Sequence, residues 1–165
     1  MRDRHLRGLY LSAARSELFN RILSLRVQRS LWNRPVEGDW LMTGSDDRAT
    51  QRWPAPDELD RLLTAQAVHP AGTIWGRGGS RLTGPALALE QEALRDAADW
   101  CMALEQAGLN AGMRPLRTPV KEPEWRANDD TLRLRFTLPP GSYATSVLRE
   151  LVANPDATEP GLEPA

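Results

Sequence analysis

Apolar residues recur at helical spacing in two long stretches of the chain. Over residues 9–32, Leu11, Leu18, Ile22 and Leu25 fall on one face, and further apolar side chains widen it. A period near 3.6 residues predicts an amphipathic helix that buries this face.

The stretch 85–107 gives the clearest helix prediction. Pro85 lies at its first turn and Gly108 at its exit, the usual positions for these two residues. Its apolar face consists of Leu87, Leu94, Cys101 and Leu104. A shorter helix is predicted to open at Pro56, and another to follow Ser142, whose hydroxyl suits an N-cap.

Strands are predicted at 40–43, 113–120 and 131–138. The last alternates cleanly between Leu or Phe and Thr or Arg, as a strand with one buried face does. The segment 69–84 contains five glycines, and we expect a surface loop there with Trp75 packed inward. It lacks the Gly-Lys-Ser/Thr ending of a phosphate loop and the third glycine of a dinucleotide fingerprint.

This order of elements predicts an α+β fold in two parts. A mainly helical lobe would span residues 1–112, and a β–β–α segment would span 113–153. Residues 154–165 are rich in Pro, Asp, Glu and Gly, which predicts a disordered tail. Two strands and one helix cannot cover a sheet face well by themselves, so we expect the sheet to be incomplete.

Composition points to a soluble folded chain in a reducing compartment. Apolar residues make up 41% and charged residues 26%, proportions typical of a folded domain. The longest apolar run, Trp100–Leu104, is far shorter than a membrane span. The lone Cys101 excludes a disulfide framework and a cysteine zinc site. We therefore expect a cytoplasmic protein without a membrane partner.

The near-neutral net charge of −1 hides a basic amino-terminal stretch. Residues 1–34 contain eight Arg against Asp3 and Glu17, a local balance of +6. Such a stretch suits a phosphate partner, although arginine on the solvated face of a helix is also ordinary. The candidate backbone contacts to RNA are Arg15, Arg21 and Arg26 in the first helix and Arg133 and Arg135 in the last strand.

No catalytic constellation is visible in the residues themselves. His5 and His69 are the only imidazoles, and we expect both at the surface or in a loop rather than as catalytic bases. There is no Gly-x-Ser-x-Gly elbow. The paired carboxylates Asp46-Asp47 and Asp129-Asp130 lie in predicted turns, where Asp shapes the backbone.

Two motifs resemble one known family. The segment 9–20, Leu-Tyr-Leu-Ser-Ala-Ala-Arg-Ser-Glu-Leu-Phe-Asn, is similar to a segment of the tRNA pseudouridine synthase D (TruD) family. The segment 138–151, Leu-Pro-Pro-Gly-Ser-Tyr-Ala-Thr-Ser-Val-Leu-Arg-Glu-Leu, looks like that family's carboxy-terminal signature. Gly38-Asp39 and Trp75-Gly76-Arg77-Gly78 between them also fit its order and spacing.

The resemblance implies a cofactor-free isomerase that converts a tRNA uridine, at position 13 of the bacterial substrate, to pseudouridine. Residues 1–112 would then be the helical insertion domain, partial at its start, and 113–153 the end of the catalytic domain. In the family, an aromatic at the third position of a Gly-Ser-aromatic-Ala-Thr motif borders the target nucleotide, and Tyr143 occupies that position. Its partners would be tRNA and the amino-terminal catalytic half, with no DNA or membrane.

The sequence departs from the family at the catalytic residue. The family's Gly-x-Lys-Asp motif is absent, as is its Asn-Tyr-Phe-Gly-like run, and the only lysine is Lys121. We therefore expect no catalytic residue on this chain, and no activity from the chain alone. Two other hypotheses stay open, a non-catalytic RNA-binding module and a helical protein-interaction domain.

Overall fold

The chain folds into two units. The structure is a computed structural model that describes residues 4–43, 49–140 and 142–151. Its internal contacts divide the chain into Met1–Arg117 and Thr118–Ala165. The division lies a few residues beyond residue 112, the boundary expected from the sequence. The α+β class is confirmed, with helices and antiparallel strands in both the first unit and the second.

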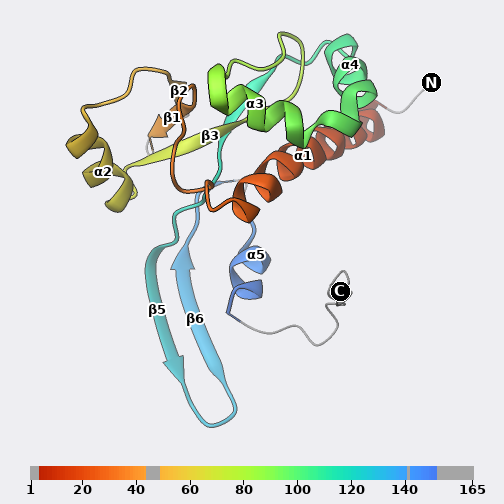
Figure 1. The fold of residues 1–165 in the computed structure, drawn as a ribbon. Helices are drawn as coiled ribbons and strands as arrows, with labels where there is room; N and C mark the ends of the chain where they lie inside the picture. Colours follow the sequence, from red (N-terminus) through yellow and green to blue (C-terminus); the bar gives the residue numbers. More distant parts are fainter. Residues whose placement is uncertain (1–3, 44–48, 141, 152–165) are drawn as a thin grey trace, which may run out of the picture. The chain divides into compact units, whose positions relative to one another are not determined.

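Two later helices of the first unit pack against its long amino-terminal helix, and a third packs against its sheet instead (Figure 1). The helices are α1 (Arg4–Gln28), α2 (Pro56–Thr64), α3 (Gly84–Ala93) and α4 (Ala98–Gln106). Helix α1 packs against β3, α3 and α4. Helix α2 begins at Pro56 as expected, with Asp57 and Glu58 in its first turn, where the helix dipole favours anions.

The helix expected over 85–107 is broken in two. A 3-10 turn, η1 (Arg95–Ala97), separates α3 from α4. Leu94 just before this turn and Ala97 at its last position are both buried, and both join the cluster formed by Leu18 and Ile22 of α1. Helical periodicity did not reveal the break, because the break serves a tertiary contact that brings Leu94 and Ala97 into one core.

A four-stranded antiparallel sheet completes the first unit. Its strands are β1 (Trp40–Thr43), β2 (Ala49–Thr50), β3 (Val68–Ile74) and β4 (Gly112–Pro115), in the order β2-β1-β3-β4. The strand predicted at 40–43 is confirmed. The expected loop 69–84 is wrong over its first part, because β3 is a central strand that pairs with both β1 and β4.

Strand β3 was not predicted because its sequence contains residues that are typical of loops. Pro70 and Gly72 are residues that strands disfavour, yet both are buried. Gly72 allows close packing, since a Cβ there would lie 2.9 Å from Leu116 Cδ2 and 3.1 Å from Phe19 Cε2. The glycine therefore serves the contact between strand and helix.

The second unit is a hairpin followed by a short helix. Strands β5 (Lys121–Ala127) and β6 (Leu132–Thr137) pair antiparallel, and α5 covers Ala144–Arg149. The strand expected at 131–138 is confirmed. The one expected at 113–120 is confirmed only over 113–115, which belongs to β4 and pairs with β3; it is wrong over 116–120, because the hairpin strand starts only at Lys121. The expected tail, 154–165, lies outside the described residues.

The start of α5 also differs from the sequence prediction. Tyr143, not Ser142, is the N-cap residue of α5, and no side chain caps this helix. The apolar side chains in and just after this helix have little cover, since Leu148 is 38% and Leu151 58% exposed.

Candidate nucleic-acid interface

The six candidate binding residues fall on two units. Three arginines lie along α1 in the first unit. Arg133 and Arg135 lie on β6, and Tyr143 precedes α5 in the second. The structure gives these side chains very different surroundings, and those surroundings decide which of them can meet a ligand.

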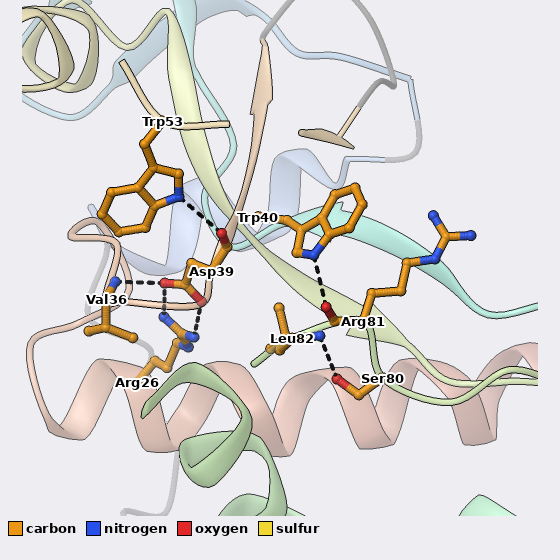
Figure 2. Close-up of polar contacts among 8 residues, drawn as sticks. All are labelled: Arg26, Val36, Asp39, Trp40, Trp53, Ser80, Arg81 and Leu82. Carbon is orange, nitrogen blue, oxygen red and sulfur yellow. Dashed lines mark hydrogen bonds and ion pairs between the residues drawn. The ribbon is translucent and has the colours of Figure 1, made fainter. Parts of the chain in front are cut away.

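Arg26 is a structural residue, which corrects the expectation that it contacts RNA. Its side chain is 1% exposed, and Asp39, its partner, is fully buried. Figure 2 shows the two-pronged contact between them: Nη1 donates to Asp39 Oδ2 at 2.9 Å, and Nη2 donates to Oδ1. The Val36 N–H and the Trp53 indole also donate to Asp39, at 2.8 and 3.1 Å. A phosphate cannot reach this guanidinium.

Arg15 also has a structural role, since it hydrogen-bonds to backbone carbonyls of other segments. Its Nε donates to the Trp75 carbonyl at 2.7 Å and its Nη2 to the Asn110 carbonyl at 2.9 Å. Burial, and secondly the charge of Arg114, lower the pKa of Arg15. The side chain joins α1 to the segments that follow β3 and precede β4, so little of its donor capacity is left for a ligand.

The positions of Arg15 and Arg26 carried a signal that our sequence analysis missed. Arg15 lies four residues before Phe19, and Arg26 lies seven residues after it. Residues at these separations share a helix face, and Phe19 is buried. Both arginines therefore lie on the buried side of α1, not on its solvated side.

Arg21 keeps an accessible charge. Its Nε pairs with Glu17 Oε1 at 2.9 Å one turn away, and both side chains are more than a third exposed. The guanidinium also lies 5.6 Å from the centre of the Trp100 ring. An exposed pair of this kind is weak, so a stronger anion can compete for Arg21.

Hydrogen bonds, one of them from the Trp40 indole, hold the glycine-rich segment after β3 in place. The Trp40 indole donates to the Arg81 carbonyl at 2.9 Å, and the Leu82 N–H donates to Ser80 Oγ at 3.1 Å (Figure 2). Trp75 packs partly buried against the main core cluster, as expected. Contacts within the protein therefore order the segment, and they use the Trp40 indole N–H and the Ser80 hydroxyl.

His69 is buried, which corrects its expected place in a surface loop. It lies in the central strand β3 at 1% exposure. Arg117 Nε donates to His69 Nδ1 at 2.9 Å, so the ring proton belongs on Nε2. Burial and the Arg117 charge lower the pKa of His69. The imidazole is a neutral packing group out of reach of any substrate.

The hairpin has one basic face. Arg126 lies directly opposite Arg133, and Glu124 opposite Arg135. Both strands alternate, so these four side chains share a face, while Trp125 and Leu134 pair on the other. Arg133 and Arg135 are exposed as an RNA contact requires. Arg126 was missed, because the strand that carries it was expected elsewhere in the sequence.

Tyr143 stands free in the second unit. Its side chain is 74% exposed, and its backbone carbonyl accepts the Ser146 N–H of the first turn of α5. An exposed phenol ring at the start of a helix can stack on a base or a ribose without sequence preference.

In the residues that the structure describes, no three His, Cys, Asp or Glu side chains gather as a metal site would require. Within the same ranges, no helix is both long and apolar enough to cross a membrane.

Exposed arginines and an exposed aromatic ring are features that nucleic-acid-binding proteins use. Comparison with known proteins defines the family. Residues 2–151 match the model of the family "tRNA pseudouridine synthase D (TruD)", and the chain belongs to that family. The resemblance stated from the two sequence motifs is confirmed.

Individual relatives agree with this assignment. The chain is 46% identical to tRNA pseudouridine synthase D of Methylococcus capsulatus, over 91% of this chain and 43% of the relative. It is 43% identical to that of Nitrosococcus oceani, over 94% of this chain and 44% of the relative. The chain thus spans less than half the length of these curated relatives.

A solved structure supports the fold. The crystal structure of the putative tRNA pseudouridine synthase D from Methanosarcina mazei matches with a TM-score of 0.65. The match covers 82% of this chain and 36% of the other, at 22% sequence identity. At that identity, the likeness concerns the fold alone.

Proposed function

We propose that this chain is part of a cytoplasmic tRNA pseudouridine synthase that isomerises uridine 13 of tRNA to pseudouridine. The observation that carries the proposal is the family match over residues 2–151. In this proposal, the first unit corresponds to the family's insertion domain and the second to the end of its catalytic domain. The division of the chain after Arg117 supports that assignment.

Tyr143 is the residue proposed to border the target nucleotide. Its position in Gly-Ser-Tyr-Ala-Thr matches the family's motif, and its 74% exposure leaves the ring free to stack. Stacking of one base on an aromatic ring is worth about 1–3 kcal/mol. The ring would orient the nucleotide, while the reacting group would come from elsewhere.

The catalytic Asp is proposed to come from a segment that this sequence does not contain. No Gly-x-Lys-Asp motif occurs in the 165 residues. The buried Asp39 cannot replace it, because Arg26 holds both of its carboxylate oxygens. Positioning groups alone do not replace a nucleophile, so the isolated chain should leave tRNA unmodified.

A chimeric enzyme tests the function. In the Methylococcus capsulatus synthase, the matching segment is replaced by this chain, and pseudouridine is measured in an unmodified tRNA transcript. We expect the chimera to form pseudouridine and the isolated chain to form none. In the chimera, Tyr143→Phe should retain turnover, whereas Tyr143→Ala should lose about 1–3 kcal/mol of transition-state stabilisation.

Each result has a clear meaning. A folded chimera without activity would reject the isomerase proposal, and tRNA binding by the chain would then favour a non-catalytic RNA-binding module. Conversion by the isolated chain would reject the proposed external Asp. Equal activity of Tyr143→Ala and the parent chimera would remove Tyr143 from the site.

A further inference from the structure

Two arginines face each other on the β5–β6 hairpin without a neutralising partner. Arg126 and Arg133 are directly opposite in the antiparallel register. Opposite residues project from the same face with Cβ atoms about 5 Å apart, and like charges so placed destabilise the pairing. Both side chains are exposed. In the part of the chain that the structure describes, neither forms an ion pair.

The next pair along the same face makes the contrast clear. Glu124 is opposite Arg135, and their charged groups lie 3.7 Å apart. That pair carries no net charge, so it attracts an outside anion less than two unpaired arginines do. The Arg126–Arg133 pair retains a local charge of +2, which an exposed two-stranded ribbon cannot neutralise.

The chemistry of the guanidinium group selects the occupant. Each arginine presents a planar fork of donors that matches the oxygens of a carboxylate or a phosphate. A carboxylate is satisfied by one fork, whereas the tetrahedral phosphate offers oxygens in several directions and can bridge two. One anion between the two forks also offsets their mutual repulsion. The exposed pair therefore suits a phosphodiester better than a protein carboxylate.

We propose that Arg126 and Arg133 jointly bind one phosphate of an RNA backbone. The inference rests on the proposed function only in naming tRNA as the RNA. It assigns a role to Arg126, which the sequence did not single out, and pairs it with Arg133 in place of the neighbouring Arg135. A phosphate contact of this kind would fix where the protein sits along the RNA backbone, without recognising any base.

Salt-dependent tRNA binding by the 165-residue chain tests the pair. An unmodified tRNA transcript is titrated at 50 to 200 mM salt with the wild type, Arg126→Gln, Arg133→Gln and the double variant. The double variant should lower the slope of log affinity against log salt by about one in total, the effect of one lost phosphate contact. Each single variant should weaken binding and lower the slope by no more than the double variant does, because both arginines share that phosphate.

Two matched controls separate the pair from general charge. Arg61→Gln removes a charge from an exposed arginine of α2 that lies near Glu58. Arg135→Gln removes the neighbouring charge, which already faces Glu124. Each of these variants should lower the slope by less than half of the change seen for the double variant, because a nearby glutamate already offsets part of the charge that is removed.

Hydrogen exchange distinguishes a lost contact from a damaged hairpin. Removing one of two repelling charges should raise the protection of the Trp125 and Leu134 amides, by up to about five-fold. Weaker RNA binding together with stronger protection supports the proposal. Weaker binding with lost protection means that the variant has unfolded the hairpin, and that result overturns a specific phosphate contact.

Three other results overturn the proposal. The first is a wild-type slope in the double variant. The second is a slope change in the double variant of about two, the sum of a loss of about one in each single variant, which would indicate two separate phosphates. The third is no tRNA binding by the wild-type chain at 50 mM salt. The chimera assay keeps the two proposals apart. An active chimera with an unchanged slope in the double variant rejects only the arginine pair, and an inactive chimera with the expected slope loss rejects only the isomerase.

Discussion

The two units use arginine in opposite ways. In Met1–Arg117, the guanidinium groups of Arg15, Arg26 and Arg117 bind carbonyls, a buried carboxylate and an imidazole. In the hairpin of the second unit, Arg126 and Arg133 are exposed, and no described residue forms an ion pair with either. A count of arginines along the sequence therefore says little about binding. What matters is whether the fold already supplies each charge with a partner.

The largest expected effect comes from the buried pair of the first unit. Arg26→Met and Asp39→Asn should each lower the free energy of unfolding by about 3–5 kcal/mol, because each leaves an uncompensated buried charge or polar group. Urea unfolding followed by far-UV circular dichroism measures this loss. Arg29→Gln is the matched control: it breaks the exposed pair with Glu92 and should cost less than about 1 kcal/mol. Similar losses in all three variants would contradict the contrast between buried and exposed arginines.

The second-largest loss of stability is expected from a substitution at Gly76, which lies just after β3. In Gly76→Ala the new Cβ would press on the Leu109 carbonyl oxygen and lie 2.9 Å from the Ala111 nitrogen. Both are backbone atoms that hydrogen-bond to Arg77, so they cannot move aside freely. We expect a loss of about 1–3 kcal/mol in urea unfolding.

The control for that substitution is Gly112→Ala. No atom lies within 4 Å of a Cβ at Gly112, and its φ is not in the left-handed region. The change should stay within about 0.5 kcal/mol. If Gly76→Ala were equally harmless, the packing of the segment after β3 would be looser than the structure indicates.

The first unit should also lose stability in mild acid through His69. The pKa of its imidazole is lowered in the folded state, so the unfolded chain binds more protons once the pH falls below 6.5. The stability tied to neutral His69 is present above pH 6.5 and declines as the pH falls towards the lowered value. One group contributes at most about 1.4 kcal/mol per pH unit.

Urea unfolding at pH 7.5 and 5.5 measures the acid effect, with His69→Gln as the comparison. Gln can accept the Arg117 hydrogen bond but does not titrate. The variant should lose less stability than the wild type between the two pH values. An identical loss in both would assign the acid sensitivity to other groups.

The smallest effect is expected in the hairpin. Arg135→Gln removes an exposed partner of Glu124, and exposed pairs contribute little. The free energy of unfolding should change by less than about 0.5 kcal/mol. A loss as large as that of Arg26→Met would mean that the hairpin, like the first unit, depends on its ion pairs.

Local patterns of the sequence determined several elements. The start of α2 at Pro56, the strand at 40–43 and the alternation of β6 depend on neighbouring residues, and all three agree with the structure. The family could also be read from two contiguous motifs, at 9–20 and 138–151. The exposed position of Tyr143 fits the motif that singled it out, although its role remains a proposal.

Tertiary packing decided the rest. Strand β3 holds Pro70 and Gly72, and only its place between β1 and β4 makes it a strand. Arg26 became a core residue because Asp39, thirteen positions away, meets it in the interior. The pairing of Arg126 with Arg133 depends on the register of the hairpin. Each of these features arises from contacts between residues distant in sequence, and hydrophobic periodicity, which reads only near neighbours, does not record them.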